Sequence, residues 1–289
     1  MKHLFLSAVI AFSLELSMDA ESQTPIRYGS NNGKYAKVNG VNLYYEEYGS
    51  GVPLLLIHGG LSSIKDVGTV IPGLSKQFRV IAVDCPGNGR SEQAGSLSYQ
   101  LMADYFSVMI DQLRLDSVYV LGFSDGGNVA LLMAADRPDK VKRIAAFAAA
   151  SNTAGYIPEA IAGLDQLNPD AIESDFKWWL DQHLSITPQK DKWRKFISDF
   201  SKMCATPVIV PDHKLDKIRS RVLLIQGDHD IVKPEHALQL HRTIKGSQLC
   251  IVPAASHFIL YERPELFNLI ALDFFTKEMK LFDFTQLGE

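Results

Sequence analysis

The chain has 289 residues and a mass of 32.1 kDa, a length that predicts one large domain or one domain with an insertion. Hydrophobic residues make up 46% of the sequence and charged residues 21%, which is ordinary for a globular protein with a sizeable core. With a net charge of −4 and no basic cluster, the sequence excludes nucleic acid as an expected partner.

The N-terminal segment, residues 1–20, resembles a secretory signal peptide. A short basic start is followed by an apolar run over residues 4–14, and Ala20 offers a cleavage position. The apolar run is too short to span a bilayer comfortably, so we expect no integral membrane association beyond this segment. Cleavage predicts export to the periplasm or secretion. An uncleaved anchor or a buried N-terminal helix is the alternative, and the protein is then membrane-anchored or cytoplasmic.

Residues 34–151 predict the first part of an α/β core. Asn39-Gly40 is a strong hairpin signal between two alternating segments. Apolar runs typical of buried strands then alternate with helical periodicity, which predicts a mostly parallel sheet covered on both sides. The expected strands after the hairpin are residues 53–57, 80–83, 118–123 and 144–149, and the expected helices are residues 99–115 and 128–135.

The pattern changes over residues 152–219. Strand signals fade, and two helical stretches, 171–182 and 190–204, carry the three tryptophans of the chain. The sheet pattern then returns, so residues 220–289 are expected to complete the core. We interpret residues 152–219 as a helical cap over a pocket, with a peripheral helical layer as the alternative.

Residues 122–127 (GFSDGG) place G-x-S-x-G between a predicted strand and a predicted helix, which is the context of a nucleophile elbow. A serine on such a sharp turn has a strained backbone, and Gly122 and Gly126 remove side chains that would collide. The helix that follows directs its N-terminal N–H groups toward Ser124. We therefore predict Ser124 as the nucleophile, with a chance match in a Gly- and Ser-containing loop as the alternative.

A serine nucleophile needs a base, most often a histidine that a carboxylate orients. His257 follows the last predicted strand, and Asp230 lies in the loop after the preceding strand, so both fall at the carboxyl ends of strands. Asp228 in the same loop is expected to serve the turn. His58 is expected to shape its own loop, and a role as catalytic base is the alternative.

The oxyanion that forms when serine attacks an acyl carbon needs hydrogen-bond donors. We expect one donor to be the backbone N–H of Asp125. The other is expected from the loop after His58, at Gly60 or, as second choice, at Leu61. Leu61 and the Asp125 side chain are also candidate substrate contacts.

The three cysteines, Cys85, Cys204 and Cys250, have no metal-type spacing and allow at most one disulfide. We interpret Cys85 as a small buried hydrophobe. The sequence predicts no metal site.

In combination, the motifs resemble the α/β-hydrolase superfamily over about residues 34–280. The segments that carry the resemblance are residues 58–60 (HGG), 84–91 (DCPGNGRS), 122–127 (GFSDGG), 227–230 (GDHD) and 257–258 (HF). The resemblance implies an eight-stranded, mostly parallel sheet with an antiparallel second strand, flanking helices, an inserted helical cap and no cofactor. It also implies that the loop 84–91 is mainly structural. Ser124 excludes the haloalkane dehalogenase and epoxide hydrolase branches, which place an aspartate there.

The elbow is similar to that of valacyclovir hydrolase-type esterases, which act on amino-acid esters. The resemblance implies that the Asp125 carboxylate attracts the α-amino group of a substrate, since opposite charges interact strongly in a partly dry pocket. The alternative is that this side chain points away and that only its N–H is used. The chain departs from that pattern in the His-Gly-Gly form of residues 58–60.

The sequence thus predicts a cofactor-independent serine hydrolase that cleaves small carboxylic esters through an acyl-enzyme intermediate, with amino-acid esters as a candidate class. The same residues can hydrolyse C–C bonds, open lactones, form peroxyacids or act as an aminopeptidase. A non-catalytic ligand-binding receptor of the same fold is the alternative from another class. The expected partner is a small-molecule ester.

Overall fold

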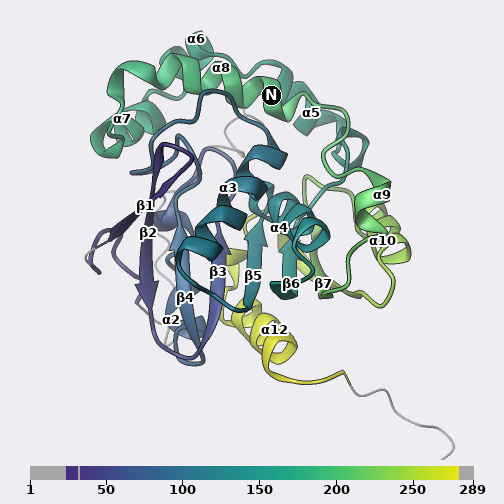
Figure 1. Ribbon diagram of the computed structural model, residues 1–289. Coiled ribbons are helices and arrows are strands. Elements are labelled where there is room, and N and C mark those ends of the chain that lie inside the picture. The colour runs from purple at the N-terminus through teal and green to yellow at the C-terminus, as the bar shows by residue number, and fades with distance from the viewer. Residues whose placement is uncertain (1–23, 32, 280–289) are drawn as a thin grey trace, which may run out of the picture.

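The computed structural model describes residues 24–31 and 33–279 of the chain, so the expected signal peptide lies outside the described residues. Over these residues, eight strands form one sheet in the order β1-β2-β4-β3-β5-β6-β7-β8 (Figure 1). The second strand, β2, runs antiparallel to β1 and β4, and every other pair of neighbours is parallel. The predicted fold is confirmed.

The bounds of the elements follow the chain. The strands are β1 (Lys34–Val38), β2 (Val41–Tyr48), β3 (Val52–Ile57), β4 (Phe78–Val83), β5 (Val118–Phe123), β6 (Val141–Phe147), β7 (Arg221–His229) and β8 (Gln248–Ser256). The helices are α2 (Ile71–Leu74), α3 (Tyr99–Gln112), α4 (Asp125–Asp136), α5 (Pro158–Asp165), α6 (Pro169–Asp175), α7 (Lys177–Ile186), α8 (Trp193–Cys204), α9 (Asp212–Leu215), α10 (Pro234–Thr243), α11 (Ile259–Glu262) and α12 (Pro264–Thr276). Short 3₁₀ helices are η1 (Ile64–Val67), η2 (Thr153–Gly155) and η3 (Lys190–Lys192).

The connection between β1 and β2 is the two-residue hairpin that the sequence predicted. Asn39 and Gly40 have φ of 47° and 86°, and the register pairs Val38 with Val41. Two successive residues in the left-handed region form a turn whose twist matches that of the strands, which is why Asn-Gly is favoured there.

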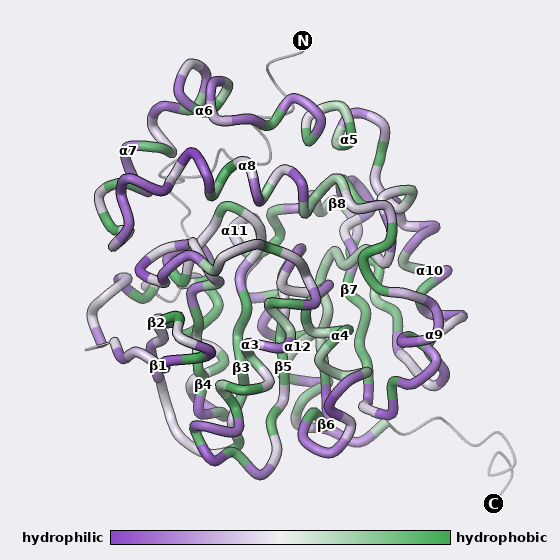
Figure 2. Tube along the Cα trace, turned by 45° about the horizontal axis from the view of Figure 1, so that its top comes forward, coloured by the Kyte–Doolittle hydropathy of each residue, from purple (hydrophilic) through white to green (hydrophobic). Residues whose placement is uncertain are grey.

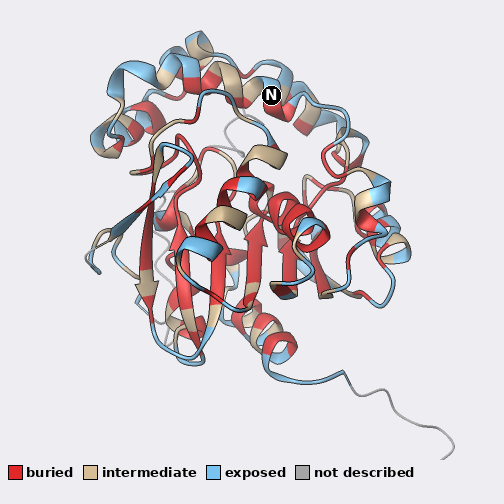
Figure 3. Ribbon diagram, viewed as in Figure 1, coloured by how far each residue is buried: buried red, intermediate tan, exposed pale blue. Residues whose placement is uncertain are grey.

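The sheet lies between two apolar layers. Buried side chains of α3 and α4 pack on one face, and those of α2 and α12 pack on the other. The central strands are therefore mostly buried, up to and including their carboxyl ends (Figure 3). They are mostly hydrophobic, while the outer turns are hydrophilic (Figure 2). A parallel sheet covered on both faces leaves its carboxyl edge as the open place for a site.

Helices α5 to α8 lie across that carboxyl edge (Figure 1). The expected helix over residues 171–182 is divided at Phe176, whose φ of −127° lies outside the helical range. The side chain of Phe176 is buried, and α7 begins at the next residue. The other expected helix begins at Trp193 after a 3₁₀ turn, and α5 was not predicted. No helix within the described ranges combines the length and apolar character that a membrane span requires.

Candidate active site

Ser124 occupies the sharp turn between β5 and α4. Its φ of 55° and ψ of −118° are rare for a residue with a side chain. A Cβ added at Gly122 would lie 2.1 Å from the carbonyl oxygen of Gly126, and one added at Gly126 would lie 2.4 Å from that of Ile57. The turn therefore has no room for side chains at these two positions, as the sequence pattern predicted.

His257 bridges Ser124 and Asp230. Its Nε2 lies 3.0 Å from Ser124 Oγ, and its Nδ1 lies 2.7 Å from Asp230 Oδ1. A neutral imidazole whose Nδ1–H donates to the carboxylate fits this geometry, because Nε2 is then free to accept from the serine hydroxyl. The structure thus brings together the three residues that sequence reasoning selected from three separate loops.

The Asp230 carboxylate is almost fully enclosed. Asp230 is 5% exposed, and its Oδ1 also accepts from the N–H of Val232 at 3.0 Å. Its Oδ2 has no hydrogen-bond partner among the described residues. The rings of Phe123 and Phe258 lie 5.0 and 5.7 Å from that of His257. In such an apolar surrounding the carboxylate interacts strongly with a positive charge that forms on the imidazole.

Asp228 and His58 have structural contacts. Asp228 is the penultimate residue of β7, and its carboxylate accepts from the N–H of Ala255, which joins β7 to the segment that leads to His257. His58 is fully buried, and its Nε2 accepts from the N–H of Cys85 at 2.9 Å. Burial lowers the pKa of His58 to about 4, so the imidazole is neutral. His58 therefore links the loops after β3 and β4.

The backbone around Ser124 offers free donors. A Cβ added at Gly59 would lie only 3.2 Å from the Cβ of Ser124, so this loop closely approaches the serine. The N–H groups of Gly60, Leu61 and Asp125 donate to no other group in the described part of the chain. They are available to an oxyanion at the turn.

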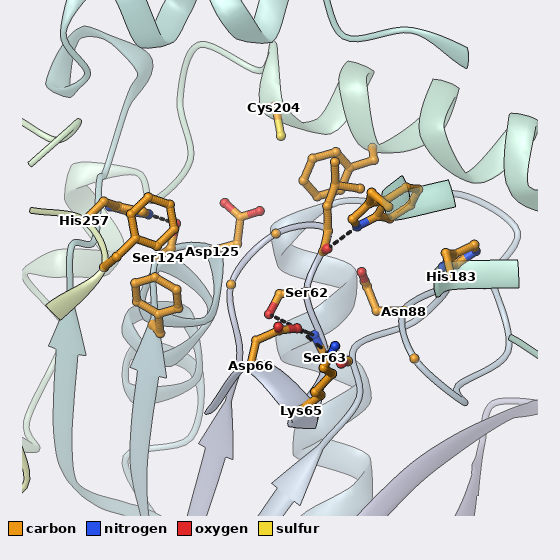
Figure 4. A pocket seen from close by; sticks show the side chains of 18 of the residues that line it. Ser62, Ser63, Lys65, Asp66, Asn88, Ser124, Asp125, His183, Cys204 and His257 are labelled. Atoms are coloured by element: carbon orange, nitrogen blue, oxygen red, sulfur yellow. Dashed lines mark hydrogen bonds between the residues drawn. The ribbon is translucent and has the colours of Figure 1, made fainter. Parts of the chain in front are cut away.

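The Asp125 side chain points into the cavity (Figure 4). Tyr99 donates its hydroxyl to Asp125 Oδ1 at 2.9 Å, and a Cβ added at Gly60 would lie 2.5 Å from Oδ2. Burial raises the pKa of Asp125 to about 6, and the bond from Tyr99 opposes the rise. Sequence reasoning left open whether this side chain points away. It also missed Tyr99, which the helical pattern of residues 99–115 marked only as a helix residue.

A cavity of about 130 Å³ lies in front of Ser124 and His257. The helices above the sheet edge contribute its roof, and the loops after β3 and β4 contribute its floor. Residues of α7 and α8 that line it include Trp178, Trp179, Gln182, His183, Phe200 and Cys204. Three or more His, Cys, Asp or Glu side chains arranged for a metal ion do not occur among residues 24–31 and 33–279.

Comparison with known proteins agrees with this architecture. The family described as alpha/beta hydrolase fold matches residues 52–192. A pimeloyl-[acyl-carrier protein] methyl ester esterase of Neisseria meningitidis serogroup C is 32% identical over 241 residues, which cover 76% of this chain and 91% of that protein. The chain belongs to the α/β-hydrolase fold family.

Two further relatives represent different activities within the fold. The human serine hydrolase BPHL, which is valacyclovir hydrolase, is 27% identical over 262 residues, covering 82% of this chain and 84% of that protein. The structure of a meta-cleavage product hydrolase from Pseudomonas fluorescens IP01 has a TM-score of 0.67 at 25% identity, covering 84% of this chain and 97% of that one. The chain is therefore similar to several kinds of hydrolase, and its fold and relatives make it a hydrolase.

Proposed function

We propose that this chain is a serine hydrolase that cleaves small carboxylic esters through an acyl-enzyme intermediate. The observation that carries the proposal is the position of His257, 3.0 Å from Ser124 Oγ and 2.7 Å from Asp230 Oδ1. A serine hydroxyl becomes a competent nucleophile when such a base accepts its proton. Residues 152–219 act as the cap that covers the substrate.

In the first half of the reaction, Ser124 Oγ attacks the acyl carbon and its proton passes to His257 Nε2. The N–H of Asp125 and that of Gly60 or Leu61 donate to the oxyanion of the tetrahedral intermediate. Asp230 stabilises the imidazolium that forms. Collapse of the intermediate breaks the ester C–O bond, and the alcohol leaves with the proton from His257.

In the second half, water replaces the alcohol. His257 accepts a proton from the water as it attacks the acyl-enzyme, and the same N–H groups hold the second oxyanion. The proton then returns to Ser124 Oγ as the carboxylic acid is released. The serine, the base and the orienting acid end each cycle as they began.

Esters of amino acids are the substrate class that the Asp125 side chain favours. Its carboxylate lies in the cavity beside the serine, with Oδ1 held by Tyr99. An ammonium group on the acyl portion would pair with it. The test compares a free amino-acid ester with its N-acetylated counterpart. A higher kcat/KM for the free amine supports the role, and equal values remove it.

The experiment for the ester hydrolase itself is Ser124→Ala, assayed on short p-nitrophenyl esters. We expect kcat to fall by a factor of about 10⁴ or more, because the covalent route is lost. Ser185→Ala, on the exposed side of α7, is the matched control and should retain wild-type turnover. Wild-type turnover in folded Ser124→Ala would contradict the proposal.

Substrate profiling separates the remaining chemistries of this fold. Esters, lactones and vinylogous diketones should be assayed side by side with the wild-type protein. We expect the highest kcat/KM among the esters. Tight ligand binding without turnover of any of them would instead support a receptor.

A further inference from the structure

A second polar pair, Asn88 and His183, faces the cavity away from the reacting residues. Figure 4 shows both on the side of the cavity opposite His257 and Ser124. Asn88 comes from the loop after β4, and His183 comes from α7. They are only 5% and 6% exposed, so their environment is set by the cavity rather than by bulk solvent. The ester cleavage described above uses neither side chain.

The imidazole of His183 has unused hydrogen-bonding capacity. Its ring is stacked between Trp179, at 5.0 Å and 10°, and Phe196, at 5.5 Å and 6°. Both faces are therefore covered, and neither ring nitrogen has a partner among the described residues. Burial lowers the pKa of His183 to about 4, so the ring is neutral and keeps one N–H donor and one acceptor. Neither nitrogen is among the fully enclosed unpaired atoms of the described residues, so the imidazole can form hydrogen bonds with a ligand in the cavity.

The amide of Asn88 also has unused hydrogen-bonding capacity. Its Nδ2 makes one long bond of 3.4 Å to the carbonyl oxygen of Pro86, and its Oδ1 has no partner in the described part of the chain. The loop is fixed beside the stack, because a Cβ at Gly87, where φ is +80°, would lie 2.5 Å from Phe196. The same Phe196 ring therefore lies against both the Asn88 loop and His183.

The position of Asn88 and His183 in the cavity indicates that they face the acyl part of a substrate. His257 must give its proton to the leaving alcohol, so the alcohol lies beside His257. The acyl chain then extends to the other side of Ser124, where Asn88 and His183 lie. Neither side chain carries a charge that would offset that of a buried carboxylate. A hydroxyl group, which both donates and accepts, matches a neutral imidazole and an amide.

We propose that Asn88 and His183 form a subsite that binds an uncharged hydroxyl group at the far end of the acyl chain. The subsite rests on the proposed function, since it assigns the acyl specificity of the same cavity. It selects hydroxylated acyl groups over their deoxy counterparts, because only a hydroxyl group can form hydrogen bonds with the two side chains.

The test compares p-nitrophenyl esters of ω-hydroxy acids with the corresponding unsubstituted esters over a series of chain lengths. At the chain length that reaches the pair, we expect wild-type kcat/KM to favour the hydroxylated ester by about tenfold. His183→Phe keeps an aromatic ring in the stack, and Asn88→Leu keeps a side chain of similar size. In each variant the ratio should fall to about one. His213→Phe, on the exposed helix α9, is the matched control and should keep the wild-type ratio.

A binding measurement keeps this test separate from that of the ester hydrolase. Ser124→Ala is titrated with methyl ω-hydroxyalkanoates and methyl alkanoates while the fluorescence of Trp178 and Trp179 in the cavity is followed. Tighter binding of the hydroxylated ligand, lost with His183→Phe in the same background, supports the subsite even if the Ser124 mechanism fails. Ratios that are the same in wild type, His183→Phe and Asn88→Leu at every chain length overturn the subsite and leave the ester hydrolase standing.

Discussion

The indole Nε1–H of Trp179 donates to the main-chain carbonyl oxygen of Leu61 at 2.7 Å. The two residues are only 7% and 6% exposed, so the bond is shielded from solvent. Leu61 has a φ of 48°, so the bond is made to a residue in a strained turn. Through this bond α7 holds the loop that contains the Gly60 and Leu61 N–H groups. The roof of the cavity therefore helps to position the proposed oxyanion donors.

Replacement of Trp179 by Phe should slow catalysis more than it weakens binding. The change leaves the buried carbonyl of Leu61 without its donor and releases the loop, so donors aimed at the transition state lose alignment. We expect kcat to fall by about tenfold with a smaller change in KM. Trp193→Phe at the start of α8 is the matched control. An unchanged kcat in Trp179→Phe would mean that the loop holds its position without α7.

Gly122→Ala should destabilise the elbow. The new Cβ would lie 2.1 Å from the carbonyl oxygen of Gly126. Neither atom can move away by a side-chain rotation, because the Cβ is fixed by its own backbone and the oxygen belongs to the main chain. We expect the free energy of unfolding to fall by about 3 kcal/mol and ester hydrolysis to be lost. Denaturant unfolding measures the first and p-nitrophenyl ester assays the second. Gly95→Ala is the control, because nothing lies within 4 Å of its added Cβ.

The preference for a free amino group should depend on pH. Burial raises the pKa of Asp125 to about 6, so the carboxylate is charged above that pH and becomes neutral below it. The ratio of kcat/KM for an amino-acid ester to that for its N-acetyl analogue should therefore fall as pH drops through about 6. It should also fall at alkaline pH, where the substrate's own ammonium group, with an ordinary pKa of about 7.7, loses its charge. Any titration common to both esters cancels in the ratio.

Asp125→Asn provides the control for that profile. The variant keeps the backbone N–H and a side chain of the same shape but carries no charge. Its ratio should be low and should not fall as pH drops through about 6. A ratio in Asp125→Asn that still falls through pH 6 would assign the titration to another group.

Tyr28→Phe should destabilise the protein most at alkaline pH. Tyr28 donates its hydroxyl to Asp84 Oδ2 at 2.6 Å, and Asp84 also accepts from the N–H groups of Ile64 and Arg90. Burial raises the pKa of Asp84 to about 7, while the Tyr28 bond favours its charged form. The contribution of the hydroxyl is therefore present above about pH 7 and is lost as pH falls through that value.

The measurement is the free energy of unfolding from pH 5 to pH 9. At the alkaline end, Tyr28→Phe should lose about 2 kcal/mol, the usual contribution of a hydrogen bond to a charged group. Tyr35→Phe is the matched control, because Tyr35 is 55% exposed. An equal loss at both ends of the pH range would contradict the link to Asp84.

Local patterns predicted the sheet well. The turn at Asn39-Gly40 requires two successive residues in the left-handed region, and Asn-Gly is one of the few dipeptides that adopt this conformation readily. Continuous apolar runs predicted the buried strands because both faces of a parallel sheet are covered. The positions of Ser124, Asp230 and His257 followed from the same logic, since the carboxyl ends of parallel strands meet at one edge.

Local sequence patterns could not predict the part of the site that lies above that edge. Phe176 divides a helix that the periodicity predicted as continuous, because its side chain is buried by packing between elements. Tyr99, Asn88 and His183 reach the cavity only through the way α3, the loop after β4 and α7 come together. Asn88 lay in the loop 84–91 that resemblance marked as mainly structural, so nothing in the sequence singled out its side chain.

The most direct test of Ser124 as the nucleophile is mass spectrometry of the protein after treatment with a fluorophosphonate. We expect one adduct per chain, on the peptide that contains Ser124. Labelling should be slowed by about 10³-fold or more in His257→Gln, because the serine loses its base. No adduct on Ser124 in the folded wild-type protein, or labelling of Ser124 at the wild-type rate in His257→Gln, would contradict a nucleophilic Ser124 that His257 activates.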